Sequence, residues 1–263
     1  MKKILVQIYE IQEPQEAAPL IELGVDHIGG VILFRDQWRM PLLRESIELI
    51  NQSSSASTLI PLLMETDGIL QAIAYYNPRL VHFCDDIPLQ DGNHTEKACE
   101  RIIRLHERVH REFPAIRVIR SIPVPEAHLP GVDEAGRAVL RIASLLEDSC
   151  DFFMTDTLMG WTTGESSSPQ PVEGFVGITG RCCHWGIASA LCRQARIPVI
   201  LAGGISPDNV REALLAVRPA GVDSCTLTNI TDHKGLPVRF RKDPARVRRL
   251  LDEVRLIEAD SDS

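Results

Sequence analysis

The chain has 263 residues, of which 44% are hydrophobic and 24% charged, and its formal net charge at pH 7 is −8. This composition is typical of a globular protein and excludes a disordered or collagen-like chain. The acidic balance disfavours nucleic acid as a partner, and no apolar run approaches the roughly 20 residues of a membrane span. We therefore expect no nucleic-acid partner and no membrane partner.

The cysteines and the first residues indicate a cytoplasmic protein. Seven cysteines are scattered along the chain, and no Cys-x-x-Cys pair indicates a zinc or thioredoxin-type site. Reduced thiols are typical of the cytosol. The start, MKKILVQIYE, lacks the long apolar stretch of a signal peptide, and its alternation of apolar and polar residues is typical of a strand.

Short apolar, β-rich runs alternate with helix-length segments along the chain. The predicted strands are Ile4–Tyr9, His27–Leu33, Thr58–Leu63, Leu80–Phe83, Arg117–Ile122, Phe152–Asp156, Pro198–Leu201 and Val222–Thr226. The predicted helices include Pro41–Asn51, Glu96–Glu112, Glu134–Glu147, Asn209–Val217 and Pro244–Ile257. Asp208 and Asp243 precede the last two as N-cap residues, and Pro244 suits a first helical position. Pro19 would shorten or kink the first helix.

Eight strands that alternate with helices imply parallel pairing and right-handed crossovers. A doubly wound open sheet usually has five or six strands and a Gly-x-Gly-x-x-Gly motif after the first, which is absent here. We therefore predict an α/β fold, a (β/α)₈ TIM barrel, as a single domain over residues 1–263. The polar segment TTGESSSPQP indicates a flexible loop at 157–180, either a lid or plain disorder, and residues 259–263 are expected to form a short disordered tail.

Chemistry in such barrels lies at the carboxyl ends of the strands, and phosphate often binds beside strands seven and eight. The polar residues and glycines at these ends are Gln7, Tyr9, Glu10, Arg35, Arg39, Glu65, Asp67, Cys84, Asp85, Asp86, Arg120, Asp156, Gly203, Gly204, Ser224, Thr226 and Thr228. Among them, the glycine pair in LAGGISPDNV lets the backbone approach a ligand, and the helix that follows favours an anion. We expect a phosphorylated small molecule near Gly203, Gly204, Ser224 and Thr226; a tight turn without a ligand is the alternative.

Several segments together resemble the phosphoribosylanthranilate isomerase family of tryptophan biosynthesis over nearly the whole chain. LAGGISPDNV is similar to the family's seventh-strand motif, AGVDSCTLTN to its eighth strand and ELGVDHIGGVIL to its second. GITGRCCHW resembles the family's Gly-Thr-Gly loop, with Arg181 in place of the usual lysine. The resemblance implies that Thr179 and Gly180 close over the substrate, that Arg39 meets its carboxylate, and that Asp156 is the general acid. His184 and the two cysteines before it are expected to be structural.

The first strand departs from the family pattern. There the family has Lys-x-Cys-Gly, whose cysteine is the general base of the Amadori rearrangement, whereas this chain has Gln7-Ile8-Tyr9-Glu10. A tyrosine with an ordinary pKa of about 10 is a poor base near neutral pH. Thr226 and Thr228 also replace residues of the family's eighth-strand Ser-Gly-Val-Glu, which weakens the implied phosphate site.

Three readings of the function remain open. The first is an isomerase that acts on a phosphorylated sugar derivative, with Asp156 as acid and Tyr9, Glu10 or Cys84 as base, and no cofactor. The second is a binding protein that keeps the phosphate site without the chemistry. The third is a lyase or epimerase with a magnesium or manganese ion, for which the possible ligands are Glu65, His82, Asp85 and Asp156. A monomer or a homodimer fits each reading.

Overall fold

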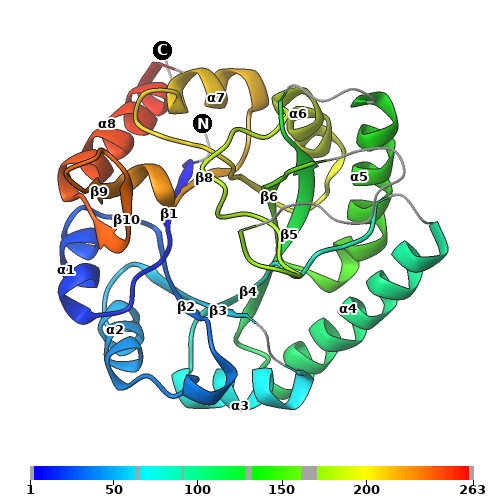
Figure 1. Ribbon diagram of the computed structural model, residues 1–263, viewed down its shortest axis with the longest axis horizontal. Helices are drawn as coiled ribbons and strands as arrows, with labels where there is room; N and C mark the ends of the chain where they lie inside the picture. Colours follow the sequence, from blue (N-terminus) through cyan, green and yellow to red (C-terminus); the bar gives the residue numbers. More distant parts are fainter. Residues whose placement is uncertain (1–2, 63–64, 90–91, 128–131, 161–170, 261–263) are drawn as a thin grey trace.

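The computed structural model describes residues 3–62, 65–89, 92–127, 132–160 and 171–260, and it confirms the predicted barrel. The barrel strands are β1 (Leu5–Ile8), β2 (His27–Ile32), β3 (Ala56–Pro61), β4 (Leu80–Phe83), β5 (Arg117–Pro125), β6 (Phe152–Leu158), β7 (Val199–Leu201) and β8 (Gly221–Ser224). Each strand pairs in parallel with the next, and β8 pairs with β1 to close the sheet (Figure 1).

Helices form a ring around the strands, as Figure 1 shows. They are α1 (Pro14–Glu22), α2 (Pro41–Asn51), α3 (Thr66–Tyr76), α4 (Gly92–Glu112), α5 (Val132–Leu146), α6 (Trp185–Gln194), α7 (Val210–Val217) and α8 (Pro244–Asp260). Short 3-10 turns lie at η1 (Arg35–Gln37), η2 (Glu147–Ser149) and η3 (Thr226–Thr228). Pro19 lies inside α1, which has nine residues.

Side chains along β4 alternate between the helix layer outside the barrel and the barrel interior. Val81 and Phe83 pack in an outer cluster with residues of α3 and α4, such as Ile73 and Val109. The intervening residue, His82, faces the barrel interior, where its ring stacks on Tyr9 with centroids 5.4 Å apart. Because side chains alternate in this way, polar residues at inward positions of a strand reach the barrel axis.

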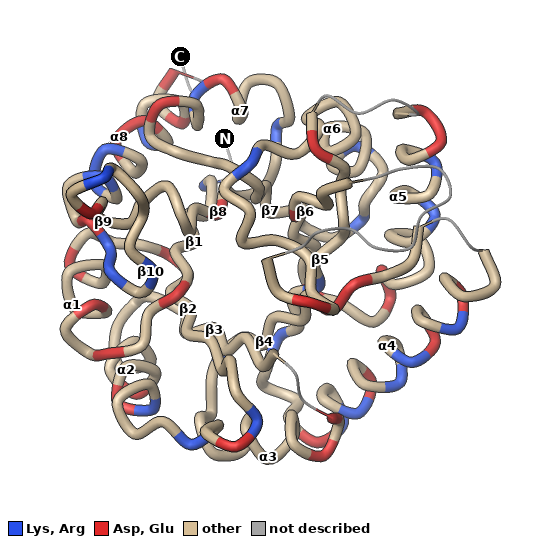
Figure 2. Tube along the Cα trace, viewed as in Figure 1, with Lys and Arg blue, Asp and Glu red and all other residues tan. Residues whose placement is uncertain are grey.

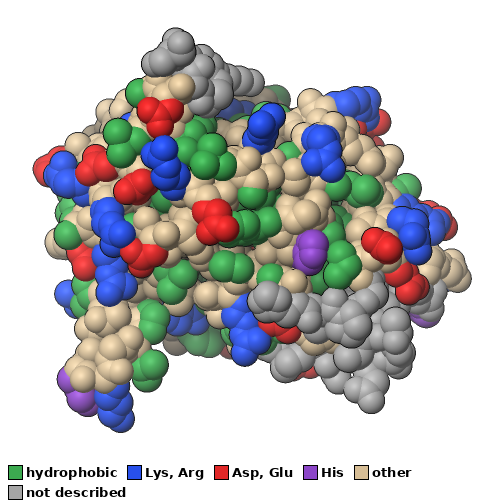
Figure 3. All heavy atoms as spheres, turned by 90° about the horizontal axis from the view of Figure 1, so that it is seen from above, with side chains coloured by type: hydrophobic (Ala, Val, Ile, Leu, Met, Phe, Trp, Pro, Cys, Tyr) green, Lys and Arg blue, Asp and Glu red, His purple; other side chains and the backbone are tan. Residues whose placement is uncertain are grey.

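The barrel strands carry four charged residues, namely Arg117, Arg120, Asp156 and Asp223. Figure 2 shows charges concentrated instead on the helices, α4 and α8 above all. In the side view of Figure 3, basic and acidic side chains are interspersed over the visible face without a patch of one sign. None of the helices in the described ranges is both long and apolar enough to cross a membrane.

Several predicted boundaries differ from those observed. Strands β5 and β6 run further than predicted because their ends pair with each other, up to Pro125 opposite Leu158. Thr157 and Leu158 are therefore strand, whereas residues 161–170 of the predicted loop lie outside the described residues. The predicted tail begins too early, because α8 continues to Asp260, which pairs with Arg211; residues 261–263 are not described.

Helix caps and one hairpin complete the differences. Asp243 caps α8 as predicted and accepts from the backbone N–H of Ala245 at 2.9 Å. The predicted cap Asp208 instead pairs with Arg249, and Asn209 occupies the N-cap position of α7. A hairpin of β9 (Asn229–Thr231) and β10 (Pro237–Lys242), which the sequence did not suggest, lies between β8 and α8. It is this hairpin that supplies cations near the barrel mouth.

Candidate active site

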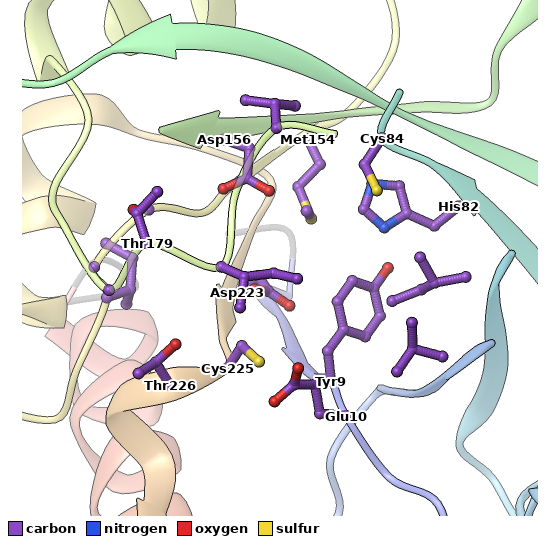
Figure 4. A pocket seen from close by; sticks show the side chains of 18 of the residues that line it. Tyr9, Glu10, His82, Cys84, Met154, Asp156, Thr179, Asp223, Cys225 and Thr226 are labelled. Atoms are coloured by element: carbon purple, nitrogen blue, oxygen red, sulfur yellow. The ribbon is translucent and has the colours of Figure 1, made fainter. Parts of the chain in front are cut away.

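A pocket opens at the carboxyl ends of the barrel strands, where Figure 4 shows the side chains that line it. Seven of the predicted site residues line this pocket together: Tyr9, Asp156, Thr179, Gly180, Gly203, Gly204 and Thr226. Thr179 and Thr226 lie at one end of the view, Asp156 and Asp223 near the middle, and Tyr9, His82 and Cys84 at the other end. The strand-end rule thus selected residues that do meet in one place.

Two predicted site residues lie outside the pocket lining. The guanidinium of Arg39 is exposed and stacks on the indole of Trp38, with its carbon 4.3 Å from the ring centroid. Ser224 is buried, and its hydroxyl donates to the carbonyl of Ile205 at 2.7 Å. The roles predicted for Arg39 and Ser224 in ligand binding stay predictions.

The Gly-Ile-Thr-Gly loop lies directly against Asp156. A Cβ on Gly177 would lie 2.0 Å from Oδ2 of Asp156, and the φ of Gly177 is +105°. Only glycine therefore lets the loop cover this carboxyl group. At the other end of the loop, Gly180 approaches the side chain of Thr226 on the far side of the pocket, at 3.5 Å from an added Cβ. The loop bridges the ends of β6 and β8.

The glycine pair after β7 meets the chain's own loop as well as the pocket. A Cβ on Gly204 would lie 2.6 Å from the backbone of Arg181 and of Cys182, and one on Gly203 would lie 2.3 Å from the hydroxyl of Thr157. Within the described residues, the N–H groups of Gly180, Gly203 and Gly204 donate to no protein acceptor. Free N–H groups that line a pocket are suited to an anion.

The residues that follow the loop have structural contacts. His184 is the N-cap of α6, and its Nδ1 accepts from the N–H of Ile187 at 3.3 Å. The thiol of Cys183 is buried and donates to the carbonyl of Ala202, while Cys182 lies near the carbonyl of Gly204. These contacts agree with the structural roles predicted for the three residues.

Asp156 and Asp223 form an acidic pair inside the pocket. Burial, then the nearby Asp223, raises the pKa of Asp156 well above its usual range, although the N–H of Thr157 donates to its carboxyl group. Burial also raises the pKa of Asp223 to about 7, against a lowering by the hydrogen bond from Gln7 and by Lys242. The surroundings of Asp156 therefore favour its protonated form, and Asp223 is divided between its two forms near neutral pH.

Asp223 is a site residue that the sequence analysis missed. It lies inside β8, near the start of the predicted strand Val222–Thr226 and away from its carboxyl end. Its partner is Gln7 in β1, whose Nε2 donates to Oδ1 of Asp223 at 3.1 Å and whose Oε1 lies 3.1 Å from Nδ1 of His27. A signal was available, because Asp156 and Asp223 are the two acidic residues within the barrel strands.

The other titratable groups of the pocket are held in neutral forms. Burial raises the pKa of Tyr9 well above 10, and its buried hydroxyl lies near Thr58 without a well-formed hydrogen bond. Burial likewise raises the pKa of the Cys84 thiol, and it lowers the pKa of His82 to about 3. None of these three groups is placed to accept a proton from carbon near neutral pH.

Glu10 is buried at the end of β1 and pairs with Arg239 of the hairpin. Nε of Arg239 donates to Oε1 of Glu10 at 2.9 Å, and Nη2 donates to the same oxygen. The φ of Glu10 is +66°, a left-handed conformation that favours glycine. The ion pair therefore holds a strained residue in the pocket wall.

Three of the four residues considered as metal ligands, Glu65, His82 and Asp85, have separate partners. Glu65 pairs with Arg35, Asp85 with Arg120 at 2.6 Å, and Nε2 of His82 lies 2.8 Å from the Ser121 hydroxyl. In the described ranges, no group of three or more His, Cys, Asp or Glu residues is arranged to hold a metal ion. The structure gives the metal-dependent reading no support.

Comparison with known proteins gives a consistent picture. No family model matches the chain. It is 25% identical over 268 residues to the N-(5'-phosphoribosyl)anthranilate isomerase of Methanosarcina acetivorans, covering 96% of this chain and 94% of the relative, and further relatives have the same name. The isomerase structure from Pyrococcus furiosus matches with a TM-score of 0.65, 19% identity and coverage of 96% and 99%. Over nearly its whole length, the chain is therefore similar to phosphoribosylanthranilate isomerases in sequence and in fold.

A second solved phosphoribosylanthranilate isomerase is in complex with reduced 1-(o-carboxyphenylamino)-1-deoxyribulose 5-phosphate; its TM-score is 0.62, with 16% identity and coverage of 96% and 98%. The chain has the predicted general acid, Asp156, in its pocket and departs from the pattern it resembles at the first strand. The positive φ of Glu10 is a conformation that glycine adopts without strain, and glycine stands at that place in the Lys-x-Cys-Gly motif that the first strand departs from. The family base is replaced by Tyr9, whose ring lies against Gly29.

A valine at position 204 is expected to disrupt the site. Gly204→Val should destabilise the protein by about 1–3 kcal/mol more than Gly24→Val, because its Cβ meets the backbone of Arg181 and Cys182. Gly24 is the matched control, since its φ is also positive and nothing lies within 4 Å of an added Cβ. Urea unfolding measures the difference in the free energy of unfolding. Equal destabilisation by the two variants would show that the backbone at Arg181 and Cys182 moves aside at no cost in stability.

Proposed function

We propose that the chain isomerises a phosphorylated sugar derivative by proton transfer, a rearrangement of the kind that the relatives' name describes. The observation that carries the proposal is the acidic pair in the pocket, Asp156 and Asp223. The loop from Gly177 to Gly180 lies against Asp156, and the N–H group of Gly180 at its end has no protein acceptor within the described residues. Two carboxyl groups whose surroundings hold them in different protonation states are suited to act as acid and base.

Asp156 would act as the general acid. The raised pKa of its carboxyl group favours the protonated form, which can protonate the ring oxygen of a glycosylamine. The bond between that oxygen and C1 then breaks, the ring opens, and C1 becomes an iminium carbon. Gly177 covers one side of this partly exposed carboxyl group and so reduces its contact with bulk water.

Asp223 would act as the general base in place of the family cysteine. In its ionised form it would remove the proton from C2 of the iminium, giving an enolamine that takes a proton on carbon C1 and yields the ketose. The electrons of the broken C–H bond move into the carbon skeleton, so neither an oxidant nor a cofactor is needed. A pKa of about 7 is near the optimum for a base at neutral pH.

Tyr9 stays a predicted catalytic residue, with a narrower role than that of a base. Because its phenol is neutral, it can donate a hydrogen bond to a sugar oxygen or hold the sugar by packing. The proposed phosphate contacts are the N–H groups of Gly180, Gly203 and Gly204 and the hydroxyls of Thr179 and Thr226. A cytoplasmic location is also proposed, supported by seven cysteines that are all free thiols; a monomer or homodimer stays a prediction.

The test has a binding part and a turnover part. Ribulose 5-phosphate should raise the melting temperature of the protein, whereas ribulose should not, because the N–H groups are suited to the phosphate. Phosphoribosylanthranilate should be turned over weakly, and complementation of a tryptophan-requiring strain that lacks the isomerase should be poor. Absence of stabilisation by any phosphosugar would refute the proposal. Stabilisation without turnover of any phosphoribosylamine would favour the second candidate, a binding protein, which the missing family cysteine supports.

A further inference from the structure

Among the residues that the structure describes, the pocket lining contains acids and no Lys or Arg. Three of its described lining residues, Glu10, Asp156 and Asp223, carry carboxyl groups, and none of the described lining residues is Lys or Arg. The pKa of the one lining histidine, His82, is lowered to about 3 by burial, so its ring is neutral. A ligand group in this pocket therefore meets hydrogen-bond acceptors and no positively charged side chain among the described lining residues. The backbone donors that it can meet are the N–H groups of Gly180, Gly203 and Gly204.

Two cations near the acids, Arg239 and Lys242, are already engaged. Both Nε and Nη2 of Arg239 donate to Glu10, which neutralises that carboxylate in place. Nζ of Lys242 is buried and donates to the carbonyl of Cys225 at 2.7 Å and to the side chain of Asn229. Neither side chain can meet a ligand without leaving a buried partner unpaired.

The arginines that follow β2 do not serve the pocket either. Arg35 pairs with Glu65, with 3.5 Å between Nη1 and Oε1, and both side chains are exposed. Arg39 stacks on Trp38, outside the lining. The wall on the β1–β4 side is instead apolar, formed by Val31, Ile60, Leu62 and the rings of Tyr9 and His82.

A carboxylate placed against this wall would lose water without gaining a cation, and it would lie in the same pocket as Asp223 and Glu10. Both effects oppose its binding. The phosphate is different because it lies at the other end, where Gly180, Gly203 and Gly204 offer N–H groups. An uncharged aromatic or aliphatic group meets neither penalty and buries apolar surface.

We propose that the ligand of this pocket is a phosphorylated sugar whose second group is an apolar amine substituent without an acid, so that the pocket selects against a carboxylate. The inference rests on the proposed function, since it uses the same pocket and the same phosphate end. It differs from that function in assigning the substrate class. The substrate would be an N-glycoside of a phosphorylated pentose with an uncharged aromatic or aliphatic amine.

Calorimetric titration of three phosphosugars tests the proposal on the wild-type protein. The probes are reduced 1-(o-carboxyphenylamino)-1-deoxyribulose 5-phosphate, the same compound without its carboxyl group, and ribulose 5-phosphate. The phenyl compound should bind at least about tenfold more tightly than either of the others, because it alone joins an apolar group to the phosphate without an acid.

A matched pair of variants tests the cause. Glu10→Gln removes the charge that holds Arg239, so the carboxyphenyl compound should gain about tenfold in affinity while the phenyl compound changes little. Glu16→Gln is the control, because Glu16 pairs with Arg241 of the same hairpin at 3.2 Å and does not line the pocket. It should leave all three affinities unchanged.

The outcomes separate this inference from the function on which it rests. If the carboxyphenyl compound binds wild type as tightly as the phenyl compound, selection against the acid is refuted while phosphosugar binding stands. If ribulose 5-phosphate binds as tightly as the phenyl compound, the apolar group is not recognised and the inference fails. If none of the three binds, the proposed function fails and the inference fails with it. The wild-type comparison holds whether or not Glu10→Gln folds.

Discussion

Asp223→Asn is expected to lower turnover by about 10²–10⁴-fold while phosphosugar binding is retained, because an amide cannot accept the C2 proton. The substrate for this measurement is N-(5'-phosphoribosyl)aniline, which lacks the acid that the pocket selects against. Asparagine can still accept the hydrogen bond from Gln7, so the pocket wall should keep its shape. Asp86→Asn is the control, since Asp86 follows the neighbouring strand β4 but is exposed and does not line the pocket.

The pH dependence of the same reaction gives an independent measure. Turnover should rise with pH through about 7, as Asp223 ionises, and fall once Asp156 loses its proton. Gln7→Leu removes a hydrogen bond that lowers the pKa of Asp223, so the rising limb should move to higher pH. A rising limb that stays in place in Gln7→Leu, or full activity of Asp223→Asn, would assign the base to another residue.

The second large effect is on stability, and it has the opposite sign. Asp223→Asn should stabilise the protein above pH 7 and have little effect near pH 4. A folded pKa of about 7 against an ordinary 3.8 means that the folded state holds the proton more strongly than the unfolded state. The stability from this protonation is fully present below about pH 4 and is lost as the pH rises through about 7.

The size of the effect follows from the pKa. At roughly 1.4 kcal/mol per pH unit, the wild type loses up to about 4 kcal/mol across this range, and the variant avoids that loss. Urea unfolding of both proteins at pH 4.5 and pH 8 measures it. Asp252→Asn, on the exposed face of α8, should show no such pH-dependent difference. Equal stability of Asp223→Asn and wild type at pH 8 would mean that Asp223 is well solvated or well paired.

The barrel could be predicted because each strand is a short apolar, β-rich run that is visible in the local sequence. Leu80–Phe83 was predicted at its observed bounds, and the other seven strands lie within a few residues of theirs. The ends of β5 and β6 were missed because they are strand only through their pairing with each other. The β9–β10 hairpin was missed for a related reason: its arginines are stabilised by Glu10 and Glu16, more than 200 residues earlier.

The site could be predicted where the chemistry depends on strand ends and glycines. Asp156 and the glycines at 180, 203 and 204 lie in the pocket because the barrel brings strand ends together. The role of Asp223 was not visible, since its pKa depends on burial and on a hydrogen bond from Gln7 across the closing pair of strands. The position of Arg39 was also not visible, because the spacing of residues does not give the direction of a long side chain.

The left-handed backbone of Glu10 gives this pocket a short evolutionary path to a different ligand. Glycine adopts a φ of +66° without strain, so Glu10→Gly would relax the first strand at the same time as it releases the guanidinium of Arg239. Glutamate and glycine codons differ by a single nucleotide. A change of specificity usually lowers stability. Glu10→Gly would instead relieve the backbone strain and free the guanidinium of Arg239 for a ligand. The preference can therefore change from uncharged to acidic substrates by a single substitution that also relieves backbone strain.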